Sequence, residues 1–168
     1  MTHFNSPHSA AAFGAKLHEV PPRIKAILMA KEIDLVASLG ELPPSHAGRL
    51  RFLATADPSV IAAVRFGVLF VMALWSGPSL RAFTQLKQAL AAADPGGNLE
   101  VIVIDADGSA GLQGMPEFAG KLHGWGECAW IKDGRVAYTS GRGFHPEVFD
   151  PLTRRFMAEA SPALPRHA

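Results

Sequence analysis

The sequence predicts an α/β fold in which a central mixed sheet carries helices on both faces. The stretch Val68 to Trp75 is uniformly apolar, which is typical of a strand covered on both sides. Amphipathic spacing follows from Leu80 to Leu90, and residues 99–106, apolar from Val101 to Ile104, are typical of another buried strand. Near the end, Asp133-Gly134 stands between two short strand-like segments, as in a hairpin. Alternating strands and helices followed by a hairpin indicate a mixed sheet.

Composition supports a folded globular protein. The chain has 168 residues, of which 48% are hydrophobic and 18% charged, and this length suits one domain plus an appendage. The net charge is +1, and the 16 basic residues form no stripe of the kind that nucleic-acid binders use. The single cysteine, Cys128, excludes an intrachain disulfide and a cysteine-rich zinc site. We expect no nucleic-acid partner and no metal.

Nothing in the sequence indicates a membrane partner. The first 16 residues lack the basic start and apolar core of a signal peptide. The longest apolar run, residues 60–75, contains Arg65 and is shorter than the roughly 20 residues that a membrane-spanning helix needs. We therefore expect a cytoplasmic protein.

Residues 1–47 are expected to form an N-terminal extension with one amphipathic helix. Residues 1–19 show no periodicity, whereas apolar residues fall on one face of residues 22–39. This helix either packs against its own domain, which we expect, or forms a homo-oligomer. The proline-containing residues 41–48 are expected to be a linker.

Residues 48–160 are expected to form the domain, and residues 161–168 a flexible tail. The predicted strands are an edge strand at 49–55, the central strand, 99–106, 127–132 and 135–139. The predicted helices are a short one capped by Asp57, the one after the central strand, at most a short one around 115–122, and a final one opened by His145-Pro146.

The central strand and its helix meet at a tight turn. Ser76 is a favourable N-cap, and Pro78 suits a first helical turn. Residues 94–97, Asp-Pro-Gly-Gly, are expected to end the helix.

This turn resembles the active site of a known family. Trp75-Ser76-Gly77-Pro78-Ser79 is similar to the Trp-Cys-Gly-Pro-Cys motif of thioredoxins, with serine at both cysteine positions. Residues 101–107 and 131–136 are similar to that family's next strand and its last hairpin. The resemblance covers roughly residues 48–160 and implies a thioredoxin-like fold with a helical N-terminal extension.

The resemblance also implies that thiol chemistry has been lost. Disulfide exchange requires a thiolate, and neither Ser76 nor Ser79 can supply one. Thioredoxins carry a buried aspartate where this chain has Phe70, and a cis-proline where it has Gly126. Four departures together indicate a natural redox-inactive member, with Phe70 in the core. We expect Cys128 to be a packed thiol, because free cysteine is among the most buried residue types.

We therefore expect a protein-binding, chaperone-like or assembly module without catalytic residues or cofactor. The former active-site face would be the contact surface. Its residues are Trp75, Ser76, Gly77, Pro78, Ser79, Trp125 and Gly126. Of the two tryptophans, Trp75 is expected to be the more buried because it follows the central strand directly. The alternative is that both tryptophans cover the core and that Ser76 only caps its helix.

Two enzyme alternatives remain open. The first is a glutathione-binding, transferase-like protein centred on Ser76, since helix starts favour anions. The second is a Mg-dependent phosphatase centred on Asp105 and Asp107, because Val101–Ser109 resembles the nucleophile strand of haloacid-dehalogenase-type phosphatases.

Overall fold

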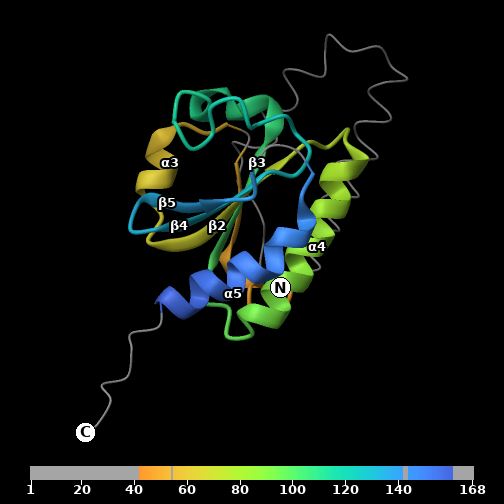
Figure 1. Ribbon diagram of the computed structural model, residues 1–168, viewed down its shortest axis with the longest axis vertical. Helices are drawn as coiled ribbons and strands as arrows, with labels where there is room; N and C mark the ends of the chain where they lie inside the picture. The colour runs from red at the N-terminus through yellow and green to blue at the C-terminus, as the bar shows by residue number, and fades with distance from the viewer. Residues whose placement is uncertain (1–41, 54, 142–143, 161–168) are drawn as a thin grey trace, which may run out of the picture.

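The computed structural model describes residues 42–53, 55–141 and 144–160, and these form one five-stranded sheet covered by helices (Figure 1). The strands are β1 (Leu50–Leu53), β2 (Phe66–Met72), β3 (Glu100–Asp105), β4 (Cys128–Lys132) and β5 (Arg135–Thr139). The α-helices are α3 (Pro58–Ala62), α4 (Gly77–Ala93) and α5 (Phe149–Ala160). The 3₁₀ helices are η1 (Ala47–Arg49), η2 (Ala106–Leu112) and η3 (Pro146–Val148).

The sheet is mixed, as the sequence predicts. Its strand order is β1-β3-β2-β4-β5. Strands β1 and β2 run parallel to β3, whereas β4 is antiparallel to β2 and β5 is antiparallel to β4. The central position of β2 and the edge position of β1 are both confirmed.

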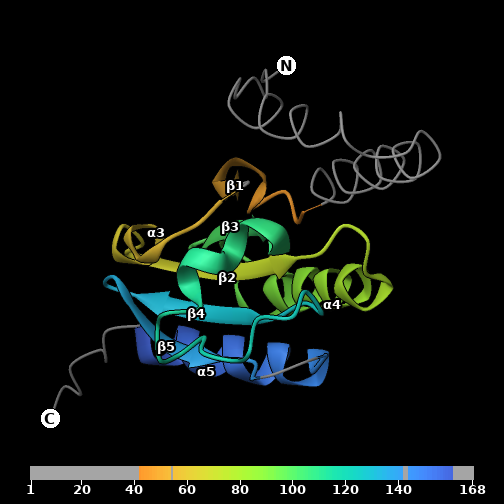
Figure 2. The same ribbon diagram turned by 90° about the horizontal axis from the view of Figure 1, so that it is seen from above.

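Strand β2 divides the core into two layers because successive side chains of a strand point to opposite faces. Val68, Phe70 and Met72 pack in one layer with α4 and α5. Leu69 and Val71 pack in the other with α3 and η2. Figure 2 shows α4 and α5 lying beside each other on one side of the sheet. A strand enclosed in this way must be apolar along its whole length, which explains the run from Val68.

The predicted helix ends are confirmed for α4. Ser76 is its N-cap, with the side-chain oxygen accepting from the Ser79 backbone N–H, and Pro78 lies in the first turn. Asp94 follows the last helical residue as the C-cap. At the two ends of a helix some backbone N–H and C=O groups have no partner within the helix, and these caps supply partners for some of them.

The hairpin and the last helix also follow the prediction. Asp133 and Gly134 have φ values of 49° and 75°, the left-handed conformation that a tight hairpin turn requires. Helix α5 is opened by η3, and Phe149 and Phe156 are buried against the sheet.

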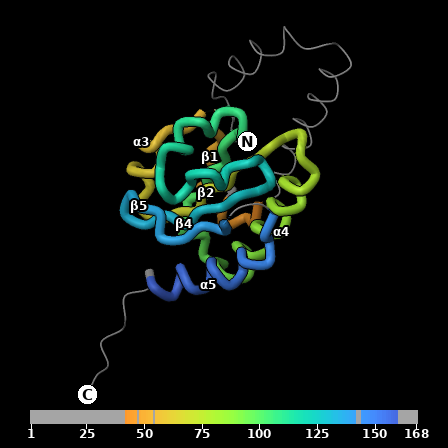
Figure 3. Tube along the Cα trace, turned by 45° about the horizontal axis from the view of Figure 1, so that its top comes forward, coloured from red at the N-terminus to blue at the C-terminus, as the bar shows by residue number. Residues whose placement is uncertain are grey.

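The linker expectation is wrong. Residues 42–48 belong to the domain, because Leu42 and His46 are buried in it. Residues 115–122 form turns, which agrees with at most a short helix there, but the 3₁₀ helix η2 was not predicted. The Asp105 side chain accepts from the Asp107 backbone N–H and so starts a helix immediately after β3. Figure 3 shows the chain that continues from η2 to β4 running past the start of α4.

Other expectations fall outside the described residues. These are the N-terminal helix at 22–39, its docking or oligomer formation, and the tail at 161–168. Within the described ranges, no helix is both long and apolar enough to cross a membrane.

Candidate functional site

The turn after β2 and the loop before β4 lie against each other, as the resemblance predicts. A Cβ atom placed on Gly126 would lie 3.5 Å from the Cα of Ser79. A Cβ atom placed on Gly124 would lie 3.5 Å from Cζ2 of Trp75. The loop residues therefore pack directly on the turn that carries the serines.

Both serines of the turn are buried and hydrogen-bonded inside the protein. The Oγ of Ser76 accepts from the Ser79 backbone N–H at 3.4 Å. The Oγ of Ser79 accepts from the Ala73 backbone N–H at 3.0 Å and donates to the Met72 sulfur at 3.4 Å. These hydroxyls hold the strand end and the helix start together, a structural role that needs no ligand.

Phe70 lies in the core, as predicted. It is fully buried and packs on Phe83 and Phe149, with ring centroids 5.1 and 6.5 Å away. The Cβ absent from Gly126 would meet its ring tip at 3.2 Å. Apolar packing thus occupies the place beneath the turn where the resemblance implies an acid in thioredoxins.

Gly126 occupies the position expected for a cis-proline, and its backbone needs glycine. Its φ is 98°, outside the range that residues with side chains prefer. A Cβ there would also lie 2.4 Å from the Cβ of Ala82 in α4. The loop before β4 therefore approaches α4 more closely than any larger residue allows.

Glu127 holds this loop in shape, and sequence reasoning missed it. One carboxylate oxygen accepts from the His123 backbone N–H at 3.0 Å. The other accepts from the backbone N–H groups of Gly124 and Trp125, both at 3.1 Å. The sequence did contain a signal, since Glu127 directly precedes a buried strand, and a buried carboxylate must find hydrogen-bond donors.

The two tryptophans are equally exposed, so the expectation that Trp75 is the more buried is wrong. Their exposed fractions are 49% for Trp75 and 50% for Trp125. Strand β2 ends at Met72, and two more residues place Trp75 on the turn, beyond the sheet. Of the other predicted face residues, Gly77 is exposed and Pro78 half-buried, whereas Ser76, Ser79 and Gly126 are buried. We call Trp75, Gly77, Pro78 and Trp125 the turn face.

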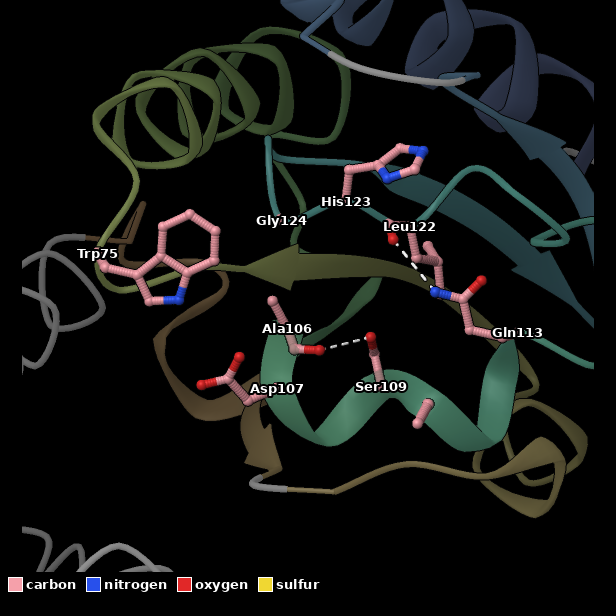
Figure 4. A pocket seen from close by; sticks show the side chains of 9 residues that line it. Trp75, Ala106, Asp107, Ser109, Gln113, Leu122, His123 and Gly124 are labelled. Carbon is pink, nitrogen blue, oxygen red and sulfur yellow. Dashed lines mark hydrogen bonds between the residues drawn. The ribbon is translucent and has the colours of Figure 1, made fainter. Parts of the chain in front are cut away.

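A small open cleft of about 210 Å³ borders the turn face (Figure 4). Trp75 forms one wall, and Asp107, Ser109 and Gln113 line it from η2 and the turn that follows. Leu122 to Gly124 complete it. Sequence reasoning did not anticipate the cleft, because it depends on where the chain after η2 lies.

Cys128 is a packed thiol, as expected. It is buried in β4, and this burial raises the pKa of the thiol well above its ordinary value of 9.0. A thiol with such a raised pKa forms little of the nucleophilic thiolate.

Asp105, the last residue of β3, also has a structural role. An Asp105 oxygen accepts from the Asp107 backbone N–H at 3.0 Å as the cap of η2. Among the described residues, no three His, Cys, Asp or Glu side chains gather where they could share a metal ion.

No model of a known protein family matches the chain, and no curated protein sequence does. Similar solved structures include one on the thiol-resolving mechanism in yeast mitochondrial 1-Cys peroxiredoxin via glutathione/thioredoxin systems. Its chain is 19% identical, with 62% of this chain and 93% of that chain covered and a TM-score of 0.47. Malassezia sympodialis thioredoxin is 14% identical, with 63% and 90% covered and a TM-score of 0.48. Plasmodium falciparum thioredoxin is 14% identical, with 66% and 100% covered and a TM-score of 0.44.

Three parallel strands are followed by an antiparallel hairpin, and helices cover both faces of the sheet. The Trp-Ser-Gly-Pro-Ser turn stands between the central strand and the longest helix of the described residues. By this arrangement the chain is thioredoxin-like in fold.

Proposed function

We propose that this protein binds a protein partner through the turn face and performs no thiol–disulfide exchange. The observation that carries the proposal is the exposure of two large aromatic side chains, Trp75 and Trp125, at one edge of the domain. Tryptophan is enriched at binding hot spots because it buries a large area with few rotatable bonds. Among the described residues these two are the exposed large hydrophobic side chains.

The interior beneath the turn face supports binding over chemistry. The hydroxyls of Ser76 and Ser79 form hydrogen bonds inside the protein, and the Cys128 thiol is buried. The loop that carries Trp125 is already held by the Glu127 carboxylate. The entropic cost of ordering this loop when a partner binds is therefore small.

Neither enzyme alternative gains a supporting observation. A transferase centred on Ser76 would need that hydroxyl to face a thiol, whereas it is buried as a helix cap. A phosphatase would need Asp105 as nucleophile, whereas one of its oxygens caps η2.

Affinity capture from extracts of the native host tests the proposal. The bait is the full chain, compared with Trp125→Ala and with Arg135→Ala as the control. Arg135 is exposed on the β4–β5 hairpin, which lies at the opposite end of β2 from the turn face. We expect a specific partner that wild-type protein and Arg135→Ala retain and Trp125→Ala loses. Retention of the same proteins by all three baits would contradict the proposed face.

A further inference from the structure

We propose that the cleft beside Trp75 binds a basic side chain, arginine or lysine, of the protein partner. This inference rests on the proposed function and names the chemistry that the turn face recognises. The cleft lies between Trp75, η2 and the loop before β4, and apart from Trp75 none of its lining residues is assigned a role by the resemblance to thioredoxins.

The size of the cleft favours one side chain. Its volume of about 210 Å³ is below the roughly 300–1,000 Å³ typical of sites for drug-sized ligands and cofactors. The cleft is also open to solvent, so the rest of a bound partner can remain outside it. A protruding side chain of a protein surface suits such a shape.

The polar atoms of the cleft favour a hydrogen-bond donor. Within the described part of the chain, no donor contacts the exposed Asp107 carboxylate. Ser109 uses its hydroxyl hydrogen on the Ala106 carbonyl at 2.7 Å, which leaves the oxygen lone pairs to accept. Gln113 donates through Nε2 to the Leu122 carbonyl at 3.1 Å, which leaves its amide oxygen as an acceptor. The Asp107 carboxylate, the Ser109 hydroxyl and the Gln113 amide oxygen are therefore acceptor groups in the lining of the cleft.

The charge and the aromatic wall then select a cation. None of the described residues that line the cleft is lysine or arginine, and the carboxylate of Asp107 gives it a negative charge. The His123 ring approaches Trp125, with ring centroids 6.4 Å apart, and its Nε2 is bonded to the Gly120 carbonyl. The half-exposed indole of Trp75 offers a face on which a guanidinium or ammonium group binds favourably. A cation placed between this ring and Asp107 gains a charge-assisted hydrogen bond as well.

The test uses a capped Gly-Gly-Arg-Gly-Gly peptide titrated into the ¹⁵N-labelled full chain, with resonance positions as the readout. The matched probe replaces arginine by citrulline, which keeps the shape and removes the charge. We expect saturable shifts at the Trp75 indole N–H and the Asp107 and Gln113 amides. The chain should bind the citrulline peptide at least about five-fold more weakly than the arginine peptide. Added salt should lower the affinity for the arginine peptide.

Two variants locate the site. Asp107→Asn should lower the affinity for the arginine peptide about five-fold. Asp133 is an exposed acid at the far hairpin turn, and Asp133→Asn should leave this affinity unchanged. Equal binding of both peptides, equal effects of both variants, or shifts centred away from the cleft would overturn the inference. If capture finds a Trp125-dependent partner and the arginine peptide fails these tests, only the cleft assignment falls. If the peptide passes and capture finds no such partner, the proposed function falls and the cleft remains a cation site.

Discussion

A Cβ atom on Gly126 would lie 2.4 Å from the Cβ of Ala82, so the loop before β4 packs on α4 at a distance that only glycine permits. This contact holds the loop against α4, and the next residue back along the loop, Trp125, is half exposed. The chain therefore keeps the thioredoxin-like arrangement of loop and turn without a proline between them.

Gly126→Ala is predicted to destabilise the domain strongly. The added Cβ clashes with Ala82, and the φ of 98° is strained for alanine, so we expect a loss of about 2–4 kcal/mol of unfolding free energy. Gly120→Ala is the control, because Gly120 also has a positive φ, 63°, but nothing lies within 4 Å of its added Cβ. Urea unfolding of both variants checks this. Equal losses would show that strain alone, and not the contact with Ala82, matters.

Asp94→Ala is predicted to be the more damaging of two carboxylate deletions. The Nε2 of His46 and Oδ2 of Asp94 lie 3.0 Å apart with both side chains fully buried. Removing the Asp94 carboxylate leaves buried donors of His46 and Leu99 without a partner, at a cost of about 1–3 kcal/mol for each donor, whereas Asp150→Ala, which breaks the exposed pair with Arg154, should cost about 1 kcal/mol or less. Denaturant unfolding at pH 7 measures both. A smaller loss for Asp94→Ala than for Asp150→Ala would contradict the role of the pair.

The contribution of Asp94 is also predicted to depend on pH. Burial alone raises the pKa of this carboxyl, but hydrogen bonds from Asn98, Leu99 and His46 outweigh it and lower the pKa below its ordinary 3.8. Because the folded value is the lower one, the stabilisation is present above pH 3.8 and is lost as the pH falls below it. The stability difference between wild type and Asp94→Ala should therefore narrow in acid. A difference that widens in acid would contradict a lowered pKa of Asp94 in the folded protein.

Glu127→Gln is predicted to loosen the loop that carries Trp125. The two carboxylate oxygens accept from three backbone N–H groups, whereas glutamine has one acceptor oxygen and, in place of the other, an NH₂ group that can only donate. We expect a loss of about 1–3 kcal/mol and faster amide exchange at residues 123–125. Glu147→Gln, on an exposed residue before α5, is the control. Unchanged amide exchange at Trp125 would refute the role of Glu127.

The protein is predicted to have no disulfide reductase activity. Neither Ser76 nor Ser79 carries sulfur, and burial raises the pKa of the Cys128 thiol. Insulin reduction with dithiothreitol should match the rate without protein. Turnover above that rate which Cys128→Ser removes would make Cys128 a working thiol.

Much of the fold could be predicted because its signals are local. The apolar run of β2, the Ser76 cap and the Asp133-Gly134 turn each specify their own element within a few residues. The pairing of His46 with Asp94 could not be predicted from the sequence, because the partners are 48 residues apart and the segment that carries His46 has the composition of a linker. Similarly, the exposure of Trp75 depends on where β2 ends, and the end of an apolar run does not mark that point.

The candidate site divides in the same way. The resemblance of the Trp-Ser-Gly-Pro-Ser turn to a known motif places Ser79 and Gly126 on one face, and in the structure these two residues lie beside each other. The cleft beside Trp75 depends on the path of residues 113–124, which contain no regular element. Glycine and proline in this stretch exclude a long helix but do not specify a path.

The affinity of the captured partner for Trp125→Ala, measured beside the melting temperature of the variant, tests partner binding at the turn face most directly. Because Trp125 is half exposed, its removal should shift the melting temperature by no more than about 2 °C. If Trp125 is a binding hot spot, Trp125→Ala should lower the affinity for the purified partner by about ten-fold or more. The affinity of Arg135→Ala for the same partner should equal that of the wild type. Wild-type affinity in Trp125→Ala, or an unfolded variant, would contradict the account.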